Sequence, residues 1–64
     1  MKHSVPQVIR DARKALKLTQ AQLGKRMGLT KAAVSGWETG DSAPGRDHVI
    51  KLSRILDVPV EQLL

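Results

Sequence analysis

The stretch TQAQLGKRMGLTKAAVSGWE (residues 19–38) predicts two short helices joined by a glycine turn. Thr19 and Gln22 have the spacing of a capping box, in which each side chain satisfies a backbone N–H at the start of a helix. Leu23 and Met27 lie four residues apart and give this helix one inward face. The segment therefore opens with an amphipathic helix whose first turn is set by its own residues.

Two glycines indicate what packs on this helix and where it ends. Gly24 stands among helix formers, where a glycine costs about 1 kcal/mol relative to alanine. Because glycine has no Cβ, we expect Gly24 to allow the close approach of a second helix. Gly28 falls where the helix must end, since the left-handed residue that follows a helix is usually glycine.

A second helix follows the glycine turn. Thr30 has the chemistry of an N-cap, and Val34 and Trp37 are spaced to point inward together. Trp37 is therefore assigned to the core, and a ligand contact is the less favoured alternative. The outer face of this helix carries small and polar residues, namely Lys31, Ala32, Ser35 and Gly36. Two helices, a short glycine turn and such an outer face make a helix-turn-helix unit.

The flanking segments also predict helices. Ser4 has the chemistry to cap a first helix with Pro6 in its first turn, where the missing N–H does no harm. The expected buried stripes are Val5, Ile9, Ala12 and Leu16 on that helix, and Val49, Leu52, Ser53 and Leu56 on a later one. A last helical turn over residues 60–64 is expected to bring Leu63 to the core. No useful length alternates with period two, so we expect no sheet.

The pattern Q-x-x-L-G-x-x-M-G-L-T-x-x-x-V-S-x-W-E-x-G (20–40) resembles the Cro and phage-repressor family of helix-turn-helix proteins, also called Xre-like. The likeness continues into 9–20 and 44–64 and so covers nearly the whole chain. It implies an all-α, compact four- or five-helix lambda-repressor-like domain over 1–64, with the helix-turn-helix at about 20–38. It also implies a sequence-specific double-stranded DNA-binding transcriptional regulator, a repressor on a two-fold operator.

Composition agrees with a small basic domain. Sixty-four residues allow one domain, and the lack of cysteine excludes a disulfide framework and thiolate metal sites. Eleven Lys and Arg against six Asp and Glu give a net charge of +5, which favours a polyanion such as nucleic acid. No apolar run approaches the roughly 20 residues of a membrane span, and MKHSVPQV has no hydrophobic signal core. A cytoplasmic location is therefore expected.

The second helix of the unit carries the expected base contacts. An α-helix fits the major groove of DNA, and its N-terminal residues reach base edges. Lys31 and Ala32 come first, with Ser35 and Gly36 one turn later. Lys31 has donors for guanine, while Ala32 offers a methyl group for thymine. The resembling family often has a polar residue at the Ala32 position and a long polar residue at the Gly36 position.

The resemblance also implies phosphate contacts and one ion pair. The position of Gln20 binds a phosphate in the family and braces the first residue of the recognition helix. Thr30, together with free backbone N–H groups near Thr39 and Gly40, resembles other phosphate-contacting positions, although a plain connector after the helix is about equally expected. Arg13 and Glu38 match a pair of family residues that form an ion pair, and each lies beside an apolar stripe.

Other chemistries are disfavoured. His3 and His48 are far apart and lack the companions of a zinc site, so surface histidines and no metal are expected. No serine stands in a recognisable frame with a histidine and an acid, so we expect no catalytic residue and no cofactor. As the single aromatic residue, Trp37 cannot form the stacking platform of a single-strand binder.

Ile50 and Ile55 fall outside the buried stripe of the last long helix and are expected to form a homodimer contact on DNA. The chain is also expected to be the N-terminal part of a longer repressor. Two alternatives remain open: an antitoxin that binds a toxin partner through a second surface, and a protein-interaction domain without DNA binding.

Overall fold

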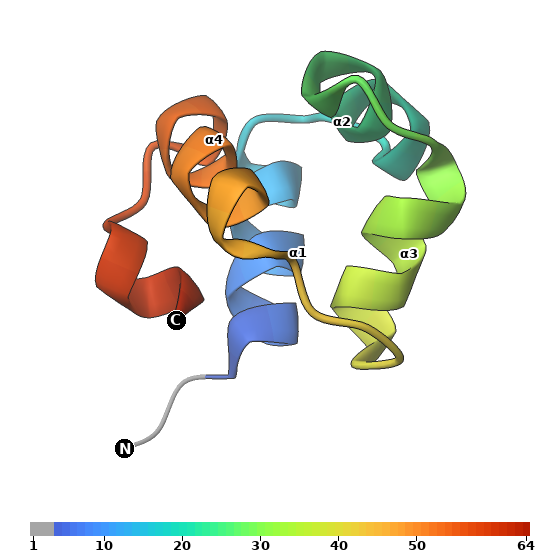
Figure 1. Cartoon of the computed structure of the whole chain (residues 1–64). Helices are drawn as coiled ribbons and strands as arrows, with labels where there is room; N and C mark the ends of the chain where they lie inside the picture. The colour runs from blue at the N-terminus through green and yellow to red at the C-terminus, as the bar shows by residue number, and fades with distance from the viewer. Residues whose placement is uncertain (1–3) are drawn as a thin grey trace.

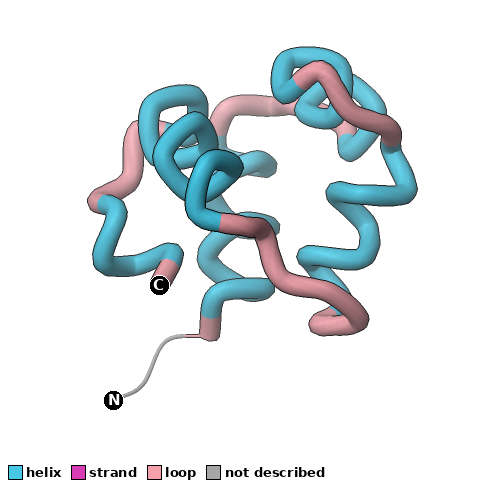
Figure 2. Tube along the Cα trace, viewed as in Figure 1, coloured by secondary structure: helices cyan, strands magenta, loops and turns pink. Residues whose placement is uncertain are grey.

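The computed structural model describes residues 4–64, which fold into four α-helices and one short 3-10 helix without any strand. The elements are α1 (Val5–Ala15), α2 (Gln20–Met27), α3 (Lys31–Thr39), α4 (Arg46–Leu56) and η1 (Val60–Leu63). Figure 1 shows α1 at the centre, with α2 and α3 on one side of it and α4 and η1 on the other. Within the described part of the chain, the all-α prediction is confirmed, and Figure 2 shows short loops joining the helices.

Three helices begin at the predicted caps. The Ser4 Oγ accepts a hydrogen bond from the Gln7 N–H at 3.2 Å, and the Thr30 Oγ1 accepts one from the Ala33 N–H at 3.3 Å. The capping box is complete, because the Thr19 Oγ1 accepts from the Gln22 N–H at 3.0 Å and the Gln22 Oε1 accepts from the Thr19 N–H at 2.8 Å. These bonds satisfy N–H groups that have no partner inside their helices.

A single apolar core holds the helices together. Each of the four α-helices and η1 contributes to it, as the predicted stripes require. The buried apolar residues are Ile9, Leu23, Met27, Val34, Trp37, Val49, Leu52, Leu56 and Leu63. Leu63 arrives through the last helical turn, so that prediction is confirmed. No helix in residues 4–64 is both long and apolar enough to cross a membrane.

The prediction is wrong at the end of α1. Leu16 was expected to be buried, but α1 ends at Ala15 and the Leu16 side chain is 44% exposed. Lys17 follows with φ 59°, and the Leu18 N–H donates back to the Arg13 carbonyl at 3.1 Å. The chain turns toward α2 at this left-handed residue, and Leu16, the C-cap of α1, stays exposed. Arg13 is buried instead.

Gly24 and Gly28 shape the turn between α2 and α3. A Cβ on Gly24 would lie 2.7 Å from the carbonyl oxygen of Thr30 and 2.8 Å from its carbonyl carbon. Such distances leave no room for a side chain, so the expected close approach at Gly24 is confirmed. Gly28 has φ 73°, the left-handed conformation expected after α2. The two helices are thereby held in one fixed relation.

Candidate nucleic-acid interface

Helix α3 has a buried side and an outer face. Val34 and Trp37 are buried, whereas the outer face, defined as Lys31, Ala32, Ser35 and Gly36, is exposed at its first two residues and half-buried at the other two. Figure 1 shows α3 along one edge of the molecule. The predicted residues are therefore brought together on one side of one helix, with Lys31 at its N-terminal end.

The loop after α3 folds back over the second turn of that helix. The Ser42 N–H donates to the Gly36 carbonyl at 3.2 Å, and a Cβ on Gly36 would lie 2.8 Å from the Ser42 Oγ. Sequence reasoning placed Gly36 on the outer face but missed Ser42, since nothing in the spacing of six residues indicates that the loop returns. The Ser42 hydroxyl therefore lies at the edge of the outer face, beside Gly36.

The prediction of free N–H groups near Thr39 and Gly40 is wrong at Gly40. Gly40 ends α3 with φ 84°, and its N–H donates to the Gly36 carbonyl at 3.1 Å. The next N–H, of Asp41, donates to the Thr39 Oγ1 at 3.4 Å. The left-handed cap directs these donors back onto the helix end, so they serve the loop. The exposed Thr39 side chain remains a candidate, although its hydroxyl also donates to the Gly36 carbonyl at 3.2 Å.

Arg13 and Glu38 form the ion pair that the sequence predicts. The Arg13 Nε donates to the Glu38 Oε2 at 2.6 Å, and the Arg13 Nη2 donates to the Glu38 Oε1 at 2.9 Å. Glu38 is 3% exposed and Arg13 is 9% exposed, so the pair is buried. Arg13 also donates from Nη1 to the Leu18 carbonyl at 2.8 Å. The bidentate geometry ties α1 to the last turn of α3.

Gln20 and Arg10 extend this pair into a network. The Gln20 Nε2 donates to the Glu38 Oε1 at 3.2 Å. The resemblance implies that Gln20 braces Lys31, the first residue of α3, but the Gln20 side chain instead holds the last turn of that helix. Arg10 also joins the network, because its Nη2 donates to the Glu38 carbonyl at 3.1 Å. Arg10 lies three residues before Arg13 on the same side of α1, and this spacing could have indicated that the two arginines share a partner.

This network keeps Glu38 charged. Burial alone raises the pKa of a carboxyl, but the hydrogen bonds from Arg13 and Gln20 and the charges of Arg13 and Arg10 outweigh it and lower the pKa of Glu38. The hydrogen bond to Glu38 raises the pKa of Arg13 despite the opposing effect of burial. Both partners are therefore ionised at neutral pH.

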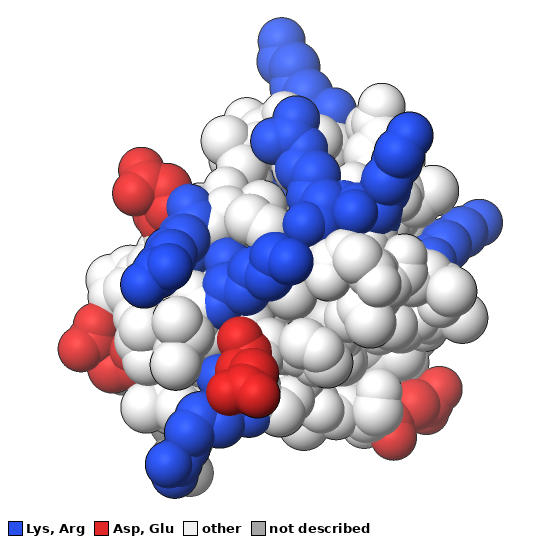
Figure 3. Space-filling model, turned by 45° about the horizontal axis from the view of Figure 1, so that its top comes forward, with Lys and Arg blue, Asp and Glu red and all other residues white. Residues whose placement is uncertain are grey.

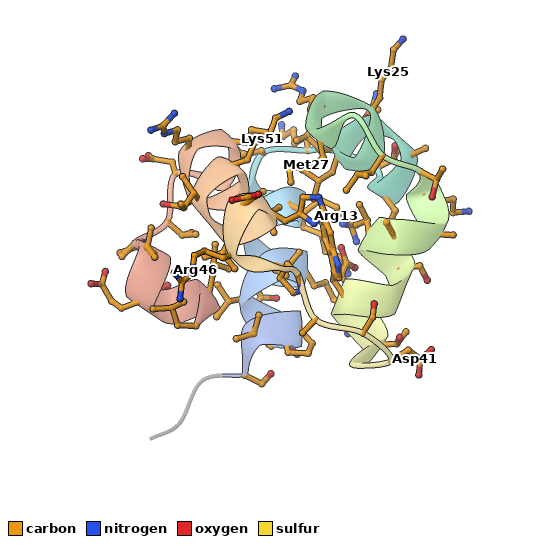
Figure 4. All side chains as sticks on the ribbon, in the orientation of Figure 1. Arg13, Lys25, Met27, Asp41, Arg46 and Lys51 are labelled. Carbon is orange, nitrogen blue, oxygen red and sulfur yellow. The ribbon has the colours of Figure 1, made fainter. Side chains whose placement is uncertain are left out.

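Positive charge is spread unevenly. Figure 3 shows Lys and Arg side chains gathered over the top of the Figure 1 view, where α2 and α4 lie. In Figure 4 the labelled Lys25 and Lys51 lie at this end, and the Lys51 Nζ donates to the Met27 carbonyl at 3.5 Å. Helix α3 itself carries one basic residue, Lys31. Lys31 is therefore the only cation that α3 itself offers to an anion at its outer face.

The other predicted residues fall in different places. His48 is half-buried with its ring centroid 5.6 Å from that of Trp37, so it is not the surface histidine that was expected, while His3 lies outside the described residues. Residues 4–64 hold no group of three or more side chains placed to bind a metal. Ile50 is 44% exposed as expected, but Ile55 is half-buried against the core.

Comparison with known proteins identifies the fold and its relatives. A family model described as Helix-turn-helix matches residues 9–63. Repressor protein C2 of Salmonella phage P22 is 39% identical over 56 residues, which are 88% of this chain and 26% of that protein. The HTH-type transcriptional regulator YobD of Bacillus subtilis, itself uncharacterized, is 38% identical over 58 residues, which are 91% of this chain and 52% of that protein.

A solved structure gives the same picture. The P22 c2 repressor in complex with a synthetic operator superposes with a TM-score of 0.91 and 35% identity, covering 98% of this chain and 96% of that chain. This chain spans about a quarter to a half of the length of the two curated relatives above.

Proposed function

Because this chain belongs to the helix-turn-helix family, we propose that it binds double-stranded DNA in a sequence-specific way through the outer face of α3, as a transcriptional regulator and repressor. The observation that carries the proposal is the outer face of small and polar side chains, exposed at Lys31 and Ala32, on a helix that Glu38 ties to α1. A convex α-helix of this kind fits the major groove. The P22 relative is a repressor whose structure was solved in complex with an operator, which supports the same function.

Each residue has a distinct role in this proposal. Lys31 donates to guanine O6 and N7, and Ala32 contacts a thymine methyl group. Ser35 lies one turn farther along the outer face, and Gly36 adds no side chain of its own. The short Ala32 side chain lets the first turn of α3 lie close to the base edges.

Phosphate contacts flank the base contacts. The Gln20 side chain is committed to Glu38, so its backbone N–H at the start of α2 takes the role of the phosphate donor. The first N–H groups of a helix have no intrahelical partner, and the helix dipole favours an anion there. Thr30 and Thr39 are exposed at the two ends of α3 and are the further candidates. We also propose a cytoplasmic location for this DNA-binding role.

We expect Lys31→Ala to relax the preference at one base position and to cost about 1–3 kcal/mol at the preferred site. The matched control is Lys25→Ala, which removes the same charge from the α2 end of the molecule. That control should weaken all duplexes slightly and evenly. Binding is measured across single-base variants of the site. An even loss for Lys31→Ala across the variants would show that Lys31 contacts a phosphate.

We also propose that two copies bind a two-fold operator, with half-sites about one helical turn apart. Ile50 is exposed on α4, and Val60 and Leu64 are exposed near the C-terminal end of the chain. A contact built from so few side chains is too small to hold a dimer in solution. On DNA the second copy is at high effective concentration, so the contact acts as cooperativity.

Ile50→Glu is therefore expected to remove cooperative filling of the two-fold site, by about tenfold in the second binding constant, and to leave half-site affinity nearly unchanged. Ile55 is unsuitable for this test because it packs against the core. Ile50→Gln, which adds no charge, controls for repulsion from DNA and should give the same result. Titrations of one-site and two-site duplexes measure both quantities. Persistent cooperativity in both variants would place the interface elsewhere.

A further inference from the structure

One row of the outer face of α3 has no polar group of its own. Ala32 and Gly36 are four residues apart and therefore lie above one another on the helix. An alanine methyl group contacts only the thymine methyl, and a glycine contributes no side chain. Any hydrogen bond to a base at this row must therefore come from a residue outside the row.

The backbone conformation at residue 36 does not require a glycine. It lies inside α3, and the two glycines with positive φ are Gly28 and Gly40. A glycine within a helix costs about 1 kcal/mol relative to alanine, so space is the reason for it. The space is occupied by Ser42, whose Oγ lies 2.8 Å and whose Cβ lies 3.9 Å from the position of a Cβ on Gly36. The Ser42 hydroxyl thus stands beside the position of the absent side chain.

The position of Ser42 is fixed by α3 itself. The Gly36 carbonyl accepts from the Ser42 N–H at 3.2 Å, the Gly40 N–H at 3.1 Å and the Thr39 Oγ1 at 3.2 Å. These hydrogen bonds hold the loop at Gly36, the residue whose outer side Ser42 covers. Ser42 is nevertheless exposed, so its hydroxyl is open to a partner molecule.

We propose that Ser42 is a specificity-determining residue, whose hydroxyl reads a base edge in place of a side chain at Gly36. The inference rests on the proposed function of the outer face of α3. A serine hydroxyl both donates and accepts hydrogen bonds, and it pairs with several base edges. Because Ala32 and Gly36 carry no long side chain, no residue of this row holds the Ser42 hydroxyl away from the groove floor.

The test begins with a duplex that the unaltered chain selects from a randomised library. Binding of Ser42→Ala and Ser42→Thr is then measured on every single-base variant of that duplex. Ser42→Ala is expected to reduce the preference at one base pair by about 3- to 10-fold, the effect of one hydrogen bond. Ser42→Thr keeps the hydroxyl and should retain the preference. Thermal unfolding checks that both variants are folded, which the exposure of Ser42 favours.

The Gly36→Ala variant provides an independent test of the same inference. Its Cβ would push the Ser42 hydroxyl aside, so it should reduce the preference at the same base pair, and it should add little in a Ser42→Ala background. An even loss across all base variants would make Ser42 a phosphate contact and overturn the inference, as would an unchanged preference. Failure of the unaltered chain to select any duplex would refute the proposed function, and the inference with it.

Discussion

Glu38→Gln is expected to lower the free energy of unfolding by about 3–5 kcal/mol. The change removes the negative charge opposite Arg13 and leaves this buried residue, which is 9% exposed, without its main counter-charge. It also weakens the bonds from Gln20 and the ion pair with Arg10, whose Nε lies 3.7 Å from the Glu38 Oε1. Small domains have only about 5–15 kcal/mol of stability, so this variant should be close to unfolding. Denaturant unfolding followed by Trp37 fluorescence measures the loss.

Glu61→Gln is the matched control, because Glu61 is exposed on η1. We expect the control to change the free energy of unfolding by less than about 0.5 kcal/mol, as for other surface substitutions. A loss below about 1 kcal/mol for Glu38→Gln would mean that the pair behaves as an exposed surface ion pair.

The same network predicts the response to acid. The folded pKa of Glu38 lies below its ordinary value of 4.5, so the unfolded chain binds the proton more readily. The stabilisation from Glu38 is therefore complete above about pH 4.5 and is lost as the pH falls through the folded pKa. Unfolding curves at a series of acidic pH values should show this loss in the unaltered chain and not in Glu38→Gln.

Binding to duplex DNA is expected to weaken by about 10³- to 10⁴-fold between 50 and 200 mM salt. The physical reason is the net charge of +5 together with an outer face on α3 that has one cation and few base-reading groups. If two copies neutralise about five to eight phosphates, the slope of log affinity against log salt concentration is about −4.5 to −7. Fluorescence anisotropy titrations at several salt concentrations give this slope. A flat dependence would contradict a phosphate-dominated interface.

Much of the fold follows from sequence because its signals are local. A capping box joins Thr19 to Gln22, three residues apart, and the buried stripes repeat every three or four residues. Leu16 shows the limit of this reasoning. Periodicity predicted its burial, but α1 ends at Ala15 and the chain turns at Lys17, whose left-handed backbone is not signalled by a glycine.

The candidate site was less predictable because its contacts are long-range. The Gln20 side chain bonds to Glu38, 18 positions away, and Arg10 reaches the Glu38 carbonyl across 28 positions. Neither contact changes the periodic pattern of either helix. Ser42 was missed for a related reason. Its role depends on how a loop returns over α3, which the spacing of Gly36, Gly40 and Ser42 does not specify.

We propose that the outer face of α3 reads double-stranded DNA. Selection from a randomised duplex library by the unaltered chain, with Lys31→Ala carried through in parallel, tests it most directly. We expect enrichment of a site with two related halves centred about one helical turn apart, and a relaxed preference at one position of each half for Lys31→Ala. Enrichment of no sequence by the folded, unaltered chain would contradict it, as would the same site, equally well defined, from Lys31→Ala.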